Sequence, residues 1–169
     1  ICYESPSEQR NGLSMINNTN LDYFSPHQKA ELFTLKAQFL RGLAPASGEI
    51  NRCFSHALAI CDSYGQGWAD WAEYCDSQFD QKPTELHYAV QAMACYLQAV
   101  YHKGSSSKLM LARVLWLLSL DDQQGTLADA FETHSKHLPP WIWLVWIPQL
   151  LTSLARPEAR VLVPREREP

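Results

Sequence analysis

The sequence lacks the short motifs that usually mark an enzyme or a cofactor site. Its seven glycines are scattered, and none lies in the GxGxxG or GxxxxGKS/T frames whose backbone holds a phosphate. It also contains no HExxH, CxxC, GxSxG, HRD or DFG motif. We therefore expect no catalytic residue, no cofactor, no metal ion and no small-molecule substrate for this chain.

Positive charge and long apolar runs are scarce as well. Fourteen Lys and Arg residues against eighteen Asp and Glu give a formal net charge of −4, whereas direct nucleic-acid binders gather basic side chains on one face. The longest apolar run, from Trp141 to Leu151, is interrupted by Pro148 and Gln149, and a bilayer span needs ~20 apolar residues. The first 20 residues hold no basic stretch followed by an apolar one. We therefore expect no direct contact with nucleic acid, no membrane span and no signal peptide.

Two polar clusters could suggest chemistry, and neither has a suitable geometry. Cys53, His56 and Cys61 lie in a helical pattern, where steps of ~100° spread them over about 140° of the helix surface. They cannot converge on one tetrahedral ion, so we interpret the cysteines as core thiols. Asp121 and Asp122 are adjacent in a loop, a placement that does not by itself make an acid–base pair.

The pattern of the chain is helical throughout. With 46% hydrophobic residues, it is typical of a globular protein and not of a disordered one. Ser25, Pro26 and Gln28 form a capping box with proline at the first helical position, which predicts a helix start, and Gly42 is expected to end that helix. Further helices are expected over about 50–61, 68–79, 84–102, 108–120, 127–136 and 141–154. Residues 1–20 are expected to be a loop or a frayed end with at most a short helix. No alternating strand pattern of useful length is present, so the predicted fold class is all-α.

The first four predicted helices repeat one another imperfectly. Residues 33–40 superpose on 68–75 with an offset of 35, close to the ~34-residue tetratricopeptide unit. The second helices superpose Cys53 on Cys95 and Ala57 on Ala99 with an offset of 42. This pattern predicts a tetratricopeptide-like helical repeat, an α-solenoid, while a non-repeating helical bundle is the alternative. A solenoid unit needs neighbours to bury its apolar faces.

The last predicted helix is apolar on every side. Trp143, Trp146, Leu150 and Leu154 follow a helical spacing on one face, while Trp141 lies on the opposite side with Leu144 and Val145. These residues are expected either to pack between stacked helix pairs or to contact a partner protein, since Trp is enriched at the centres of interfaces. The candidate contact residues are Trp141, Trp143, Trp146, Leu150 and Leu154.

Three stretches resemble the FAT region of the phosphatidylinositol 3-kinase-related kinase family, and in particular its pseudokinase members. They are KLMLARVLWLLSLDD at 108–122, TLADA at 126–130 and WLVWIPQLLT at 143–152. Shorter matches upstream are DYF at 22–24, AE at 30–31, LK at 35–36, GWA at 67–69, Trp71 and ACYL at 94–97. The resemblance spans roughly residues 20–155 and is most specific in the last third.

The resemblance implies a scaffold function. Pseudokinases of this kind are subunits of nuclear histone acetyltransferase complexes, and their kinase domain, beyond the FAT region, has lost its catalytic residues. It implies protein partners, namely subunits of these coactivator complexes and transcription activators, and localisation in the nucleus. No catalytic or ligand-binding residue of the family maps into this segment. Residues 21–155 would form the helical-repeat segment and residues 156–169, which depart from the family, a divergent charged tail of a fragment.

Two other functions are compatible with the sequence. The chain could be the FAT segment that clamps an active kinase of the same family, in which case the parent protein would carry intact catalytic-loop and metal-binding aspartates downstream. It could instead be a free-standing tetratricopeptide-like peptide-binding module, which would be a soluble monomer with a two-state melt.

Overall fold

The computed structural model describes residues 5–103 and 108–147, apart from the side chain of Val145. All regular structure in these ranges is helical, which confirms the predicted all-α class. The elements are α1 (Pro6–Asn18), α2 (Pro26–Leu43), α3 (Glu49–Ile60), α4 (Gly65–Gln81), α5 (Leu86–Lys103), α6 (Lys108–Leu118), α7 (Thr126–Ser135) and a 3₁₀ helix (Pro140–Trp146). None of the described helices is both long enough and apolar enough to cross a bilayer.

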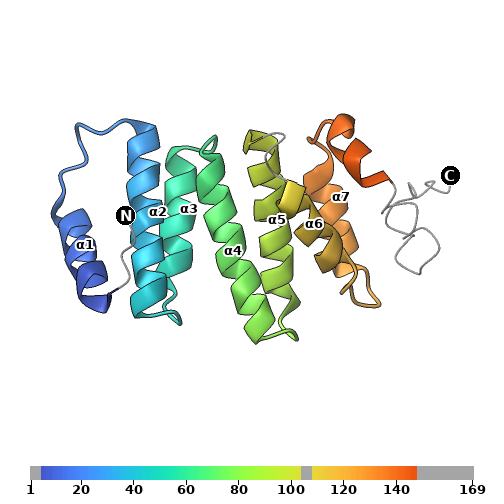
Figure 1. Ribbon diagram of the computed structural model, residues 1–169, viewed down its shortest axis with the longest axis horizontal. Coiled ribbons are helices and arrows are strands. Elements are labelled where there is room, and N and C mark those ends of the chain that lie inside the picture. The colour runs from blue at the N-terminus through green and yellow to red at the C-terminus, as the bar shows by residue number, and fades with distance from the viewer. Residues whose placement is uncertain (1–4, 104–107, 148–169) are drawn as a thin grey trace. The chain divides into compact units, whose positions relative to one another are not determined.

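The chain divides into two compact units, one up to Trp71 and one from Ala72 onward, and the boundary falls within α4. In the first unit, α2 packs against both α1 and α3 (Figure 1). The α2–α3 core is made of small and large side chains that interlock, because small residues let two helices approach closely. Its most buried members are Ala30, Ala37, Ile50, Phe54 and Ala57.

The first helix goes beyond the expectation of a loop or frayed end with at most a short helix over residues 1–20. Residues 6–18 form three turns, and the helix begins with a capping box in which Ser5 and Glu8 each accept a backbone N–H of the other. Gly12 permits the contact with α2, since a Cβ there would lie 2.5 Å from the ring of Phe39. The helix therefore depends on packing against α2, as short amphipathic helices usually do.

The predicted start of α2 is confirmed, and its predicted end is wrong. The Ser25 hydroxyl accepts the N–H of Gln28, and Pro26 occupies the first position. Gly42, however, stays helical, and the helix ends at Leu43 with Ala44 as its cap. The helix expected over about 68–79 begins earlier and ends later, because α4 runs from Gly65 to Gln81.

In the second unit, α5 is the central helix, and α6 and α7 both pack against it (Figure 1). Its fully buried face is the most extensive in the molecule's described part and comprises Ala89, Ala92, Met93, Cys95, Leu97, Ala99 and Val100. The residues that the repeat pattern matched, Cys53 with Cys95 and Ala57 with Ala99, are buried in both units. Each helix pair thus buries the same large and small positions, as a stacked-pair fold requires.

Candidate interaction surface

The segment expected to carry the contact residues is a 3₁₀ helix and not an α-helix. It begins after Pro139 with Pro140 at its first position, and Ile142 donates its N–H to the carbonyl of Pro139 at 3.1 Å. The Pro139–Pro140 pair fixes an extended entry and removes two N–H donors. Of the helix predicted over 141–154, residues up to Trp146 are 3₁₀ and Ile147 is α-helical, while Leu150 and Leu154 lie outside the described residues.

The tighter helix changes which residues share a face. With three residues per turn, positions three apart line up, so Trp141, Leu144 and Ile147 form one row. All three are exposed, to 56%, 61% and 43% respectively. An α-helical spacing would place Ile147 beside Trp143, four residues before it. The three-residue spacing places it with Trp141 and Leu144. We call this row, Trp141–Leu144–Ile147, the aromatic ridge.

The other two candidate tryptophans, Trp143 and Trp146, pack inside the second unit. Trp143 packs edge-on against Phe131 of α7, with ring centroids 5.5 Å apart and planes at 66°. The indole N–H of Trp146 is buried and has no hydrogen-bond partner among the described residues. Ile142, which precedes Trp143, is also buried, at 8% exposed. One side of the 3₁₀ helix is therefore packed within the unit, while the aromatic ridge is not.

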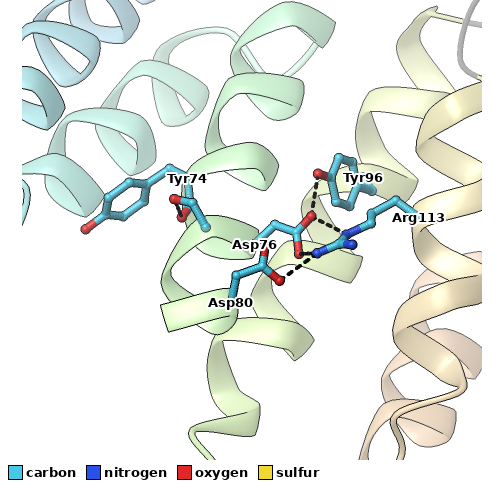
Figure 2. Close-up of polar contacts among 6 residues, drawn as sticks. Tyr74, Asp76, Asp80, Tyr96 and Arg113 are labelled. Atoms are coloured by element: carbon cyan, nitrogen blue, oxygen red, sulfur yellow. Dashed lines mark hydrogen bonds and ion pairs between the residues drawn. The ribbon is translucent and has the colours of Figure 1, made fainter. Parts of the chain in front are cut away.

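A buried polar network joins α4, α5 and α6 in the second unit. Asp76 of α4 accepts the Tyr96 hydroxyl at 3.0 Å and two guanidinium N–H groups of Arg113, at 2.6 and 2.8 Å (Figure 2). Asp80 accepts a further bond from Arg113 at 2.9 Å. The Asp76 side chain is 9% exposed and that of Arg113 is 30% exposed. The bidentate geometry, together with the Tyr96 bond, satisfies a carboxylate that would be costly to bury alone.

The same arginine continues the network to the surface. Its guanidinium lies over the Trp116 ring, 3.7 Å from the centroid, a cation–π contact. The hydrogen bonds to Asp76 are the main cause of a raised pKa for Arg113, so it stays charged, and burial beside Asp76 raises the pKa of Tyr96. The network positions helices and holds no exposed reactive group.

Asp121 and Asp122 serve as helix caps. Asp121 accepts the N–H groups of Leu127 and Ala128 at 2.7 and 3.0 Å, and Asp122 accepts the N–H and hydroxyl of Thr126 at 3.0 and 2.8 Å. These are N–H groups of the first turn of α7, which the helix itself leaves without partners. Gly125, with φ of 77°, makes the left-handed turn that brings the carboxylates into place.

The four described cysteines are free thiols, and three of them, Cys53, Cys75 and Cys95, are buried. Cys53 is buried, His56 packs against Phe33, and Cys61 contacts the Ser63 hydroxyl. Within the described ranges, no group of three potential metal ligands occurs. Burial raises the pKa of Cys95 to about 12, which leaves a thiol and not the reactive thiolate.

The sequence contained signals for the Asp76 network that a motif search does not detect. Asp76 falls on the buried stripe of α4 with Ala69, Ala72 and Phe79, and a carboxylate on an apolar stripe predicts a buried partner. Arg113 is the one cation between Leu109 and Leu118. Neither signal identifies the other residue, because the pairing depends on how α4 and α6 meet.

The sequence of this chain is similar to that of several known proteins. Residues 1–116 match the family model of the FAT domain. The chain is 42% identical over 162 residues to the SAGA complex/NuA4 acetyltransferase complex subunit Tra1 of Schizosaccharomyces pombe. It is 43% identical over 158 residues to the transformation/transcription domain-associated protein of Homo sapiens, and 36% identical over 158 residues to transcription-associated protein 1 of Drosophila melanogaster. These alignments cover 93–95% of the chain but only 4% of each relative.

Proposed function

We propose, from the premise that this chain belongs to the FAT domain family, that it is a non-catalytic scaffold segment of a transcription coactivator. The whole protein would be a subunit of nuclear histone acetyltransferase complexes and would regulate transcription through protein–protein contacts. The observation that carries this proposal is the 42% identity over 95% of the chain to a protein named as a SAGA and NuA4 complex subunit. Its partners would be other subunits of such complexes and transcription activators.

The arrangement of polar groups supports a scaffold over an enzyme. Asp76, Arg113 and Tyr96 satisfy one another in the interior, and Asp121 and Asp122 are occupied by the N-terminus of α7. Catalytic groups must instead reach a substrate from a site that substrate can enter. The polar side chains with the closest contacts therefore support the fold, and nothing in their geometry requires a substrate.

The aromatic ridge is the part of this segment that we assign to a neighbouring protein surface. Its three side chains are exposed, Trp141 and Leu144 on the 3₁₀ helix and Ile147 directly after it, and the 3₁₀ helix is anchored through Trp143 on Phe131. Trp116 and Leu120 of the same unit are 41% and 40% exposed. Apolar patches of this kind usually mark interaction sites.

The proposal is tested by isolating the full-length protein that contains this segment through an affinity tag and identifying its companions by mass spectrometry. We expect acetyltransferase-complex subunits with the wild-type protein. A variant carrying Trp141→Ser, Leu144→Ser and Ile147→Ser should lose some of them, while the control Arg52→Gln, at an exposed position of α3, should keep them all. Absence of the wild-type protein from every acetyltransferase assembly would contradict the proposal.

The alternative of an active kinase is decided on the same material. The full-length sequence beyond this segment would then contain intact catalytic-loop and metal-binding aspartates, and the purified protein would transfer phosphate from ATP. We expect neither. Transfer that disappears when those aspartates are replaced would establish the enzyme in place of the scaffold.

A further inference from the structure

Among the first three helices, α1 is the one with the least support from the rest of its unit. It has 13 residues, none of them fully buried, and it packs against α2 (Figure 1). Its middle carries Asn11 and Gly12, two residue types with low helix propensity. Isolated helices of up to ~12–15 residues are marginal in water. We therefore expect α1 to open locally more easily than the α2–α3 pair beside it.

Packing determines which residue follows Asn11. A Cβ at position 12 would lie 2.5 Å from Cε2 of Phe39 and 2.8 Å from its Cζ. The Phe39 side chain is only 4% exposed, so its ring has little room to move aside in a close-packed interior. Position 12 therefore has to be glycine for α1 to lie on α2.

The side-chain amide of Asn11 is open to reaction. Asn11 is exposed, and its side chain makes no hydrogen bond within the part of the chain that the structure describes. Gly12 has no Cβ to obstruct the approach of its own nitrogen, so this nitrogen can attack Cγ of Asn11. In an α-helix the same N–H donates to the carbonyl four residues earlier. The attack therefore takes place only while α1 is open.

We propose that Asn11 is a site of spontaneous modification, which converts it to aspartate or isoaspartate and releases α1 from α2. The Gly12 nitrogen gives its proton to hydroxide and forms a bond to Cγ of Asn11. The bond from Cγ to the side-chain nitrogen breaks, and ammonia leaves after taking a proton from water. Water then opens the cyclic imide at either carbonyl, which yields the two acids. The reaction consumes only water and does not depend on the proposed scaffold function.

Isoaspartate is the product that separates the two helices. Its main chain runs through the former side-chain carbon, which adds a backbone atom between residues 11 and 12. The helical hydrogen bonds on either side of the insertion then lose their register, and Gly12 moves away from Phe39. The apolar ring of Phe39, now 4% exposed, loses its cover. The modification is thus a slow, irreversible switch, and the opening of α1 sets its rate.

A time course of modification in the full-length protein tests the proposal. The protein is kept in mildly alkaline buffer and then cleaved after glutamate at mildly acidic pH, which gives a peptide of residues 9–31 with Asn11, Asn17, Asn18 and Asn20. Fragment masses locate the acid, and labelling by an isoaspartyl methyltransferase identifies isoaspartate. We expect Asn11 to convert at least about tenfold faster than the other three, because the residues that follow them carry side chains that hinder the attack.

Variants test the role of the open helix. Ser5→Ala removes the hydroxyl that caps α1 and should speed the modification of Asn11 by about fivefold, the size expected from the loss of a helix cap. Ser55→Ala, at an exposed position of α3, is the control and should leave the rate unchanged. Asn11→Gln should abolish the modification, since the longer side chain does not close the same ring.

Hydrogen exchange tests the release of α1. The modified protein has one more negative charge and is separated by anion exchange. Its α1 amides should exchange at least about tenfold faster than those of the unmodified protein, whereas the α3 amides should not change. The proposal is overturned by equal modification of Asn11 and Asn17, by a rate that Ser5→Ala does not change, or by unchanged protection of α1 in the isoaspartate form.

Discussion

The tryptophans of α4 and those of the 3₁₀ helix have different surroundings. Trp68 donates its indole N–H to the carbonyl of Asp62 at 2.7 Å, and Trp71 donates to the side chain of Asn51 at 2.9 Å. Their rings stack with centroids 6.0 Å apart, and Trp71 also stacks on Phe54 at 6.2 Å. Both the apolar ring and the polar N–H of each are thus satisfied inside the first unit, which fits a purely structural role.

In the 3₁₀ helix, by contrast, tryptophans lack either packing or a hydrogen-bond acceptor among the described residues. Trp141 is 56% exposed, and the buried N–H of Trp146 has no partner there. The difference teaches that a tryptophan-rich helix is not evidence of an interface by itself. What distinguishes the two regions is whether each indole finds both packing and an acceptor within its own unit.

The largest loss of stability is expected when the tryptophan stack of α4 is disrupted. Trp71→Ala removes two stacked ring contacts and leaves Asn51 without its donor. Removing a large, partly buried aromatic costs about 3 kcal/mol in the free energy of unfolding. Urea unfolding followed by circular dichroism measures the loss, and Trp71→Phe should recover about half of it. A change below about 0.5 kcal/mol, typical of surface sites, would show that α4 does not need this residue.

The second largest loss of stability is expected when the buried ion pair of the second unit is broken. Asp76→Ala leaves the Arg113 charge and the Tyr96 hydroxyl without their buried acceptor. Breaking a buried ion pair costs roughly 3 kcal/mol, reduced to about 2 kcal/mol because Arg113 is partly exposed. Asp80→Ala, which breaks only the exposed bond, is the control, with a loss of less than about 1 kcal/mol. Equal losses in the two variants would refute the role of Asp76.

The cap of α7 should matter less than either interior site. Asp121→Ala removes the acceptor of two first-turn N–H groups, and the loss of a helix cap usually costs about 1 kcal/mol. The expected readout is a lower urea midpoint with an unchanged denaturant slope. Glu132→Ala, at an exposed position beyond the first turn of the same helix, should leave the midpoint nearly unchanged.

The neighbouring carboxylate gives this cap a pH dependence. Hydrogen bonds from Thr126 lower the pKa of Asp122 below its ordinary value of 3.8. Because the folded-state pKa is depressed, the stabilisation is present above about pH 4 and is lost as the pH falls through the folded-state pKa. The difference in Tm between wild type and Asp122→Asn should therefore shrink between pH 5 and about pH 3. A constant difference over that interval would exclude ionisation of Asp122 as its cause.

The smallest loss of stability is expected for the exposed tryptophan of the 3₁₀ helix. Trp141→Ser replaces an exposed ring in the aromatic ridge, and such surface changes usually stay within about 0.5 kcal/mol. Measured beside Trp71→Ala under the same conditions, it separates an aromatic residue that stabilises the fold from one that is available for a partner. A loss as large as that of Trp71→Ala would place Trp141 in the core.

Much of the fold follows from local rules that the sequence displays. The capping box at Ser25 marked the start of α2, and Ser5 and Glu8 with Pro6 repeat the same signature at α1. That helix could therefore have been predicted, and the polar composition around it concealed the signal. The all-α class rests on the same helical periodicity and is confirmed.

The rest depends on contacts between distant residues. The pattern at Trp141–Ile147 fits an α-helix and a 3₁₀ helix about equally well over so few residues, and a proline start does not decide between them, because α1 and α2 also begin with proline. A buried carboxylate at Asp76 is predictable from its apolar stripe, but its pairing with Arg113 arises only when α4 and α6 meet.

The most direct test of the scaffold account is site-specific photo-cross-linking in the full-length protein within its native assembly. A photoreactive phenylalanine at position 141 samples the aromatic ridge, and one at position 71 samples the closed stack of α4. The account predicts that position 141 cross-links to a neighbouring protein surface and that position 71 reacts only within its own unit. Cross-linking from position 71 to another protein, with none from position 141 in an intact assembly, would contradict it.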